Sequence, residues 1–353
     1  MVKILYGVQG EGMGHATRSS AIIKELLKHH EVIIVSSDRA YQYLFDRYKN
    51  VYSIDKFDLI YKKGSVSLLL TLLKNISELS KVSSSFRKVK SLIKKFKPDI
   101  VITDFEPYTS YAAKQMGLPI ISIDNQHIIT NTNIYVPNDE ILSFLVTKLV
   151  IKLMVNYADY FLVTTYFYPK VKHKKTFLFP PILRDRILNA KPKSLNHVLV
   201  YQTSRDYEHL IPILRQIKSE HFIIYHYSEN FEEGNITYRE FTEKEFFKDF
   251  ANAKALITNG GNTMIGEAIY LHKPVLSVPV NKQFEQIVNA YYLEKLGYGE
   301  RHNSITKRTI VKFLSRLDFY KNNLKGYKQD CLLYTSDAAD EGLGVDLGGR
   351  RII

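Results

Sequence analysis

Two glycine-containing segments, far apart in the chain, contain the residue types best suited to holding a phosphorylated ligand. They are residues 10–15 (GEGMGH) and residues 258–263 (TNGGNT), and Glu267 follows the second. Gly260-Gly261 permits a tight turn from a short apolar strand into a helix that Asn262-Thr263 can cap. A helix start offers free N–H groups and a positive dipole end to an anion, and Glu267 could reach hydroxyls beside it. The second segment therefore indicates a site for a phosphate and a sugar.

Three side chains are candidates for general base chemistry. His15 ends the first glycine segment, and the unperturbed pKa of histidine suits proton transfer near neutral pH. Glu106 and Asp124 follow apolar strands, in the sequences DFEP and DNQH, and are rival bases. Each residue also has an ordinary structural interpretation: His15 could cap a helix, Glu106 could be a solvated loop acid, and Asp124 could stabilise a turn. We expect His15 to be the base, with Glu106 next and Asp124 as a further candidate.

The elements that must position these residues alternate between strands and helices. The pattern predicts strands at residues 3–8, 32–36, 99–103, 120–123, 158–164, 197–201, 222–225 and 255–257. It predicts helices at residues 16–28, 62–97, 111–116, 141–155, 206–218, 243–252 and 264–269. Such β-α-β alternation is typical of α/β proteins with parallel, doubly wound sheets. Two halves of this kind would hold a ligand in the crevice between them.

The length and the local composition suggest where the chain divides. A chain of 353 residues favours two domains of about 150 to 180 residues each. Residues 170–193 contain three prolines and many basic residues without a steady period, so we expect an N-terminal domain at 1–185 and a C-terminal domain at 186–330. Residues 331–353 read like a translated sequencing-library adapter and are excluded from fold reasoning.

Composition narrows the class of protein and its partners. A net charge of +13 indicates a surface attracted to phosphate, but no interleaved basic and aromatic motif points to nucleic acid. The single Cys331 argues against a disulfide framework or a cysteine metal site, and we expect neither metal nor cofactor. Without a long apolar run or a signal-peptide pattern, we expect a cytoplasmic protein. The basic face of residues 62–97, with Leu68 to Leu70, indicates either a solvated helix or peripheral contact with an anionic membrane.

Residues 1–300 resemble the MurG-like glycosyltransferases of the GT-B fold, particularly the archaeal and bacterial branch. The resemblance rests on residues 10–15, 104–107, 124–127 and 258–263, with Glu267, Pro274, Pro279 and Gln286. It implies two Rossmann-like domains that face each other across a cleft. It also implies an inverting, hexosyltransferase-type reaction that moves a sugar from a nucleotide diphosphate donor, expected to be a UDP-sugar. The acceptor would be a hydroxyl of a sugar or lipid-linked molecule of the cell-envelope glycan kind.

The resemblance also assigns roles to individual residues. His15 matches the histidine that ends the family's N-terminal glycine loop, and it could either deprotonate the attacking hydroxyl or support the diphosphate leaving group. The donor would lie mostly on the C-terminal domain, with its diphosphate at Gly261, Asn262 and Thr263, its ribose at Glu267 and its sugar at Gln286. The expected donor-binding residues are Gly12, Gly14, Thr203, Ser204, Gly260, Gly261, Asn262, Thr263, Glu267, Glu285 and Gln286. In the family a histidine precedes this glutamine, whereas here Glu285 precedes Gln286. Residues 285 and 286 are therefore expected to determine which donor sugar is bound.

Three other functions remain open from the sequence. The fold could serve a non-catalytic protein that binds sugar nucleotides or polyanions, or a nucleotide-sugar epimerase. A dinucleotide enzyme is disfavoured, because the first glycine segment is not G-x-G-x-x-G, although Asp38 lies at a plausible distance for a ribose-binding acid.

Overall fold

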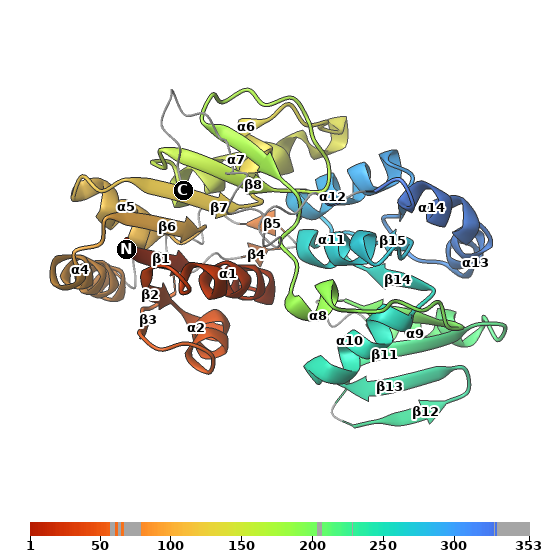
Figure 1. Cartoon of the computed structure of the whole chain (residues 1–353). Helices are drawn as coiled ribbons and strands as arrows, with labels where there is room; N and C mark the ends of the chain where they lie inside the picture. The colour runs from red at the N-terminus through yellow and green to blue at the C-terminus, as the bar shows by residue number, and fades with distance from the viewer. Residues whose placement is uncertain are drawn as a thin grey trace.

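A computed structural model describes residues 1–56, 61–62, 65–66, 79–202, 207–227, 229–327 and 329. It consists of two lobes, each built on a seven-stranded sheet with helices packed against it (Figure 1). The tail at 331–353, interpreted from the sequence as adapter-derived, lies outside the described residues.

The sheet of the first lobe is entirely parallel, in the order β3-β2-β1-β6-β7-β8-β9. Its strands are β1 (Lys3–Val8), β2 (Glu31–Ser36), β3 (Val51–Ser53), β6 (Ile100–Asp104), β7 (Ile120–Asp124), β8 (Tyr160–Thr164) and β9 (Thr176–Phe179). The central strands are runs of branched apolar residues because helices cover both faces of the sheet. The order reverses direction at β1, so the carboxyl ends of β1 and β6 meet at the switch point where such sheets bind ligands.

The sheet of the second lobe repeats the plan in the order β12-β13-β11-β10-β14-β15-β16. Its strands are β10 (His197–Tyr201), β11 (His221–Tyr227), β12 (Phe231–Glu233), β13 (Ile236–Glu240), β14 (Ala255–Thr258), β15 (Val275–Ser277) and β16 (Gly299–Arg301). Only the edge strand β12 runs antiparallel among these described strands. The predicted α/β architecture of two doubly wound halves is confirmed.

The helices occupy the connections between these strands. They are α1 (Met13–Leu26), α2 (Asp38–Phe45), α4 (Leu79–Phe96), α5 (Pro107–Gln115), α6 (His127–Asn131), η1 (Asn138–Glu140), α7 (Ile141–Met154), α8 (Asp185–Leu188), α9 (Tyr207–Arg215), α10 (Glu243–Asn252), α11 (Asn262–Tyr270), α12 (Phe284–Lys295), α13 (Lys307–Ser315) and α14 (Leu317–Leu324). Among the described residues, no helix is both long and apolar enough to cross a bilayer.

Two local predictions differ from the structure. The helix predicted over residues 62–97 is wrong at its start, where β4 (Tyr61–Lys62) pairs with β5 (Ser65–Val66) in an antiparallel ladder. A glycine between the two short strands is a turn signal that outweighs the helical spacing. Leu68 to Leu70 lie outside the described residues. The aperiodic stretch at 170–193 contains β9, which is too short to show a period.

One apolar cluster runs through both lobes and holds them together. It includes Phe105 and Phe161 of the first lobe as well as Ile265 and Phe284 of the second. Across the contact, the rings of Phe144 and Phe284 lie 5.3 Å apart. The lobes therefore share a core as well as a covalent connection. The expected domain boundary at residue 185 falls in the connection between β9 and β10 and stays a prediction.

Candidate functional site

His15 and Asp104 form a dyad at the switch point of the first sheet. Gly12, at a φ of 91° that favours glycine, is the N-cap of α1, and His15 lies in the first turn of that helix. Asp104 ends β6 and is completely buried. Its Oδ1 lies 2.8 Å from Nδ1 of His15, whose side chain is 13% exposed. One nitrogen of the imidazole thus faces a buried carboxylate, which leaves Nε2 as the nitrogen able to accept a proton.

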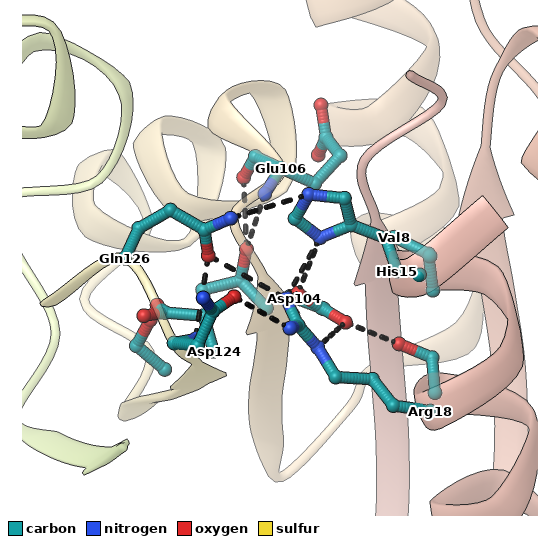
Figure 2. Close-up of polar contacts among 12 residues, drawn as sticks. Val8, His15, Arg18, Asp104, Glu106, Asp124 and Gln126 are labelled. Carbon is teal, nitrogen blue, oxygen red and sulfur yellow. Dashed lines mark hydrogen bonds and ion pairs between the residues drawn. The ribbon is translucent and has the colours of Figure 1, made fainter. Parts of the chain in front are cut away.

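Arg18 fixes this dyad from one turn further along α1 (Figure 2). Its Nε donates to Oδ2 of Asp104 at 2.8 Å, and its Nη1 donates to Oδ1 of Asn125 at 2.7 Å. The hydroxyl of Ser19 also donates to Oδ2 of Asp104, at 2.8 Å. Burial by itself would raise the pKa of Asp104, but the charges of Arg18 and His15 outweigh burial and lower it. Asp104 therefore stays ionised at neutral pH.

The carboxylate of Asp104, not Arg18, selects the tautomer of His15. Nη2 of Arg18 lies 2.9 Å from Nδ1 of His15. Arginine can only donate, and a protonated Nδ1 can only donate too, so this contact would not be a hydrogen bond if Nδ1 carries the proton. Nη2 has an acceptor of its own in Oδ1 of Asp104. Nδ1 therefore donates to Asp104, and Nε2 carries the lone pair. Nε2 lies 3.5 Å from the side-chain amide nitrogen of Gln126, a weak donor contact consistent with this assignment.

Glu106, the second candidate base, caps a helix in the structure. It is 2% exposed and is the N-cap of α5, where its carboxylate accepts from the amides of Tyr108 at 2.9 Å and Thr109 at 2.7 Å. Burial raises the pKa of Glu106 to about 6, although these hydrogen bonds oppose the rise. Phe105, between Glu106 and Asp104, has a φ of 58°, which is strained for an aromatic residue. This turn sends Asp104 towards His15 and Glu106 towards α5.

Asp124, the third candidate, is held just as firmly by its own loop. Its carboxylate accepts from the amide of His127 at 3.0 Å, from Nδ1 of His127 at 2.7 Å and from the hydroxyl of Ser122 at 2.5 Å. Burial would raise the pKa of Asp124, but His127 and these hydrogen bonds lower it to about 2. Asp124 therefore fixes the turn into α6, and the geometry favours His15 over both rivals.

The second glycine segment forms the expected turn from β14 into α11. A Cβ at Gly260 would lie 2.5 Å from the carbonyl oxygen of Gln286, so only glycine fits there. Gly261 is the N-cap of α11, and a Cβ on it would meet nothing within 4 Å. The expected capping by Asn262 is wrong, because α11 begins at Asn262, whose amide donates across the interface to the carbonyl of Thr164 at 3.3 Å. Its side chain therefore ties the turn to the first lobe.

The starts of α1 and α11 meet at the interface between the lobes. A Cβ at Gly14 would lie 3.2 Å from the hydroxyl of Thr263, so the backbones of the two helices approach closely. The N-caps Gly12 and Gly261 provide no side-chain acceptor for the first amides. Two positive helix ends therefore converge beside His15, an arrangement that attracts an anion.

Glu267 pairs with an arginine that the sequence reasoning did not select. Nε of Arg184 donates to one oxygen of Glu267 at 2.6 Å, and Nη2 of Arg184 donates to the other at 2.5 Å. Glu267 is completely buried. Arg184 also lines a cavity of about 230 Å³ between the lobes, together with Lys24, Arg47 and Arg186. Two acids of the same lining offset part of this charge, because Asp185 pairs with Lys24 and Glu243 pairs with Arg47. A ribose at Glu267 would have to share this carboxylate with Arg184.

Glu285 reaches across the interface, whereas Gln286 turns back into its own loop. Oxygens of Glu285 accept from the side-chain amides of Asn125 at 2.9 Å and Gln126 at 3.3 Å, both next to Asp124 in the first lobe. Oε1 of Gln286 accepts from the amide of Val280 at 2.9 Å and, more weakly, from Gly260 at 3.3 Å. Of the expected pair, Glu285 is the one whose side chain contacts the dyad's own hydrogen-bond network.

The remaining assignments can be placed in part. Thr203 and Ser204 lie outside the described residues. Sequence reasoning did not select Asp104, Arg18, Asn125, Gln126 or Arg184 as site residues. Asp104, Asn125 and Gln126 had a signal, because they lie in the polar segments 104–107 and 124–127 at strand ends. Arg18 had another, as a charged residue inside the predicted helix 16–28. In the described part of the chain, no group of three His, Cys, Asp or Glu side chains is arranged to hold a metal ion.

Comparisons with known proteins agree with this arrangement. Residues 2–318 match the family described as Glycosyl transferase family 1. An uncharacterized glycosyltransferase of Methanosarcina acetivorans is 28% identical over 344 residues, which cover 88% of this chain and 86% of that protein.

A second relative and a solved structure connect the chain to MurG. The UDP-N-acetylglucosamine--N-acetylmuramyl-(pentapeptide) pyrophosphoryl-undecaprenol N-acetylglucosamine transferase of Thermosipho africanus is 28% identical over 319 residues, covering 85% of this chain and 86% of that protein. The crystal structure of Acinetobacter baumannii MurG superposes with a TM-score of 0.59 at 16% identity, over 92% of this chain and 94% of that one. At this identity the likeness shows the fold, which confirms the expected two-domain GT-B architecture.

Proposed function

Because this chain belongs to glycosyl transferase family 1 and is a MurG-like glycosyltransferase, we propose that it inverts the anomeric carbon of a nucleoside diphosphate sugar during transfer. The observation that carries the proposal is the position of the His15–Asp104 dyad beside the N-terminus of α11. A base on one lobe thus faces an anion site on the other, as an in-line displacement requires.

The proton and the electrons move in one displacement. Nε2 of His15 takes the proton of the acceptor hydroxyl, while the hydroxyl oxygen forms a bond to the anomeric carbon of the donor sugar. The bond from that carbon to the diphosphate oxygen breaks on the opposite face, and the nucleoside diphosphate leaves with the electron pair. Asp104 holds the Nδ1–H and stabilises the imidazolium as it forms.

The donor side of the proposal rests on charge. The amides at the starts of α1 and α11 would hold the diphosphate, and the polar cavity beside Arg184 and Glu267 would take the nucleoside. Glu285, held by amides of the first lobe, would meet the sugar's hydroxyls. We propose a UDP-sugar because the name of the Thermosipho africanus relative includes UDP-N-acetylglucosamine. No resident metal is required in this account.

The acceptor side rests on the same relative. Its name describes transfer to a pyrophosphoryl-undecaprenol acceptor, which is a lipid-linked molecule. We therefore propose a lipid-linked acceptor of the cell-envelope glycan class, and a cytoplasmic enzyme that works at the inner face of an anionic membrane.

A donor screen followed by product analysis tests the proposal. UDP-, GDP- and dTDP-sugars are compared for the increase in Tm that each produces, and the most effective is incubated with candidate acceptors. We expect a UDP-sugar to stabilise most, acceptor-dependent release of UDP, and a product whose anomeric configuration, by proton NMR, is opposite to that of the donor. Retained configuration would reject inversion, and conversion of the sugar without any acceptor would indicate an epimerase.

A further inference from the structure

The side chain of Gln126 lies between the proposed base and the second lobe. Its Nε2 lies 3.5 Å from Nε2 of His15 and donates to Oε2 of Glu285 at 3.3 Å. Figure 2 shows the contact with His15 on the side of the imidazole away from Asp104. The nitrogen that is proposed to take the acceptor's proton therefore already faces a hydrogen-bond donor that belongs to the protein.

Contacts at both ends of the Gln126 amide set its orientation. The amide nitrogen has two hydrogens to donate, and both of its neighbours, Nε2 of His15 and the carboxylate of Glu285, can accept. The amide oxygen faces two donors, the backbone N–H of Asn125 at 3.3 Å and Nη2 of Arg18 at 3.5 Å. All four contacts are longer than an ordinary hydrogen bond. Together they orient the amide, but each is weak enough for a ligand to displace.

The backbone that carries this side chain is held more firmly. Gln126 is the N-cap of α6, and the carboxylate of Asp124 fixes the same turn by accepting from the amide of His127 at 3.0 Å. The side chain of Gln126 is buried against the site, with the residue 8% exposed. Rotation of the Gln126 side chain would therefore be enough to uncover Nε2 of His15, with no movement of α6.

A donor that is bound without an acceptor is open to hydrolysis. Water would then replace the acceptor: its oxygen bonds to the anomeric carbon, Nε2 of His15 takes its proton, and the nucleoside diphosphate leaves with the electron pair. The products would be the free sugar and the nucleoside diphosphate. The side chain of His15 is 13% exposed, so burial alone does not keep water away from it. The reaction therefore needs a group that excludes water from Nε2 until an acceptor is bound.

We propose that Gln126 is this group: its amide occupies the place of the acceptor hydroxyl on His15 and so suppresses hydrolysis of the bound donor. Sugar hydroxyls that bind Glu285 take that acceptor from Gln126, which leaves Nε2 of His15 as the remaining acceptor for its amide nitrogen. An acceptor molecule displaces the amide because its other contacts with the enzyme outweigh one weak hydrogen bond, whereas a water molecule brings no such contacts. The inference rests on the proposed function, because hydrolysis competes with that reaction.

Variants of Gln126 in the full chain test the proposal. Q126A removes the amide and opens the space beside His15, whereas Q126M removes the amide but keeps a side chain of similar length. The matched control is Q115A, because Gln115 is an exposed residue at the end of α5 that accepts only from Lys90 among the recorded bonds of its side chain. The Tm of each variant shows whether it folds, and Q126S replaces Q126A if that variant does not.

The measurement is the release of free sugar and nucleoside diphosphate from the donor without any acceptor. We expect Q126A to hydrolyse the donor at least about tenfold faster than wild type, with no gain in its rate of transfer to an acceptor. The rise in Q126M should be at least about threefold smaller than in Q126A, and Q115A should stay within about twofold of wild type. Unchanged hydrolysis by Q126A would overturn the proposal, as would equal rises in Q126A and Q126M. A merely structural role would lower hydrolysis and transfer together, which would also overturn it.

A labelling measurement separates this inference from the proposed function. Diethyl pyrocarbonate modifies the neutral imidazole, and peptide mass mapping quantifies the label on His15 with neither donor nor acceptor present. We expect His15 to be labelled faster in Q126A than in wild type, because Nε2 is then uncovered. Faster labelling in Q126A, with no transfer by the wild type, would support the contact and reject the proposed reaction. Transfer by the wild type, with labelling and hydrolysis both unchanged in Q126A, would reject the role of Gln126 alone.

Discussion

At the scale of single residues, the site depends on which carboxylate contacts His15. Asp104 does so because β6 ends beside β1, with Asp104 in register with Val8, and because the strained Phe105 turns the chain immediately afterwards. Sequence reasoning selected Glu106 and passed over Asp104, although both belong to the same polar segment, residues 104–107. One signal separates them: proline is favoured at the first helical position, so Pro107 predicts that the residue before it, Glu106, is the N-cap.

Replacing Asp104 by asparagine should reduce transfer far more than donor binding. The Nδ1–H would lose its carboxylate and the imidazolium its counter-charge, so we expect kcat to fall by about 10² to 10⁴. The donor Kd, measured by calorimetry, should change less than about threefold. The variant should also lose stability in urea denaturation, because Arg18 would keep a buried charge without its partner. An unchanged kcat would show that the His15–Asp104 dyad has no role in the reaction.

Glu106 should make the free energy of unfolding depend on pH. Its pKa is raised to about 6 from 4.5, so the folded state holds its proton more tightly. Stability from this group is present below about pH 4.5 and is lost as pH rises to about 6, a change of about 2 kcal/mol. The difference in unfolding free energy between wild type and E106Q should therefore shift by this amount over that range. E106Q should keep kcat within about tenfold of wild type; a loss as large as that of D104N would restore Glu106 as a base.

At the scale of elements, the strands were the most predictable feature. His197–Tyr201 matches its prediction, and Lys3–Val8 does too, because runs of branched apolar residues bounded by polar turns leave little freedom. Short edge elements such as β9 escaped prediction because four residues carry no period. Partnerships such as Arg18 with Asp104, 86 residues apart, depend on how the sheet brings its strand ends together, and no local pattern contains that information.

The turn into α11 gives a matched pair of glycine substitutions. G260A places a methyl group 2.5 Å from the carbonyl oxygen of Gln286, so we expect a loss of about 1 to 3 kcal/mol in unfolding free energy. G261A meets nothing within 4 Å and has a φ of −69°, which suits alanine, so its unfolding free energy should stay within about 0.5 kcal/mol of wild type. Urea denaturation measures both. Equal losses in the two variants would mean that the turn is not packed as described.

At the scale of the whole molecule, the two lobes share one core. Stacked rings of Phe167 and Tyr292, 4.0 Å apart, join the lobes, as does the apolar cluster around Phe284. The residues proposed to bind the donor and the proposed base lie on different lobes, and apolar contact between the lobes holds them in a fixed relation.

This shared core predicts one cooperative unfolding transition instead of two. In calorimetry the wild type should give a single peak, because separating the lobes would expose the common apolar cluster. F284A, at a residue 1% exposed, should lower the whole transition by about 3 to 5 kcal/mol of unfolding free energy. F319A, at a residue 51% exposed, is the control and should have little effect. Two resolved peaks in the wild type would show that the lobes fold independently.

A further whole-molecule prediction concerns metal removal. The diphosphate charge is met by the ends of two helices in this account, so incubation with EDTA should leave the rate of transfer within about twofold of its untreated value. Loss of activity with EDTA and its recovery with Mg²⁺ would mean that a cation supplies that charge.

The most direct test of His15 as the base is single-turnover transfer by H15A with saturating donor. We predict that H15A binds the donor with a Kd within about threefold of wild type and transfers its sugar at least about 10² times more slowly. Transfer by H15A at the wild-type rate, with donor binding intact, would contradict the assignment of His15 as the base.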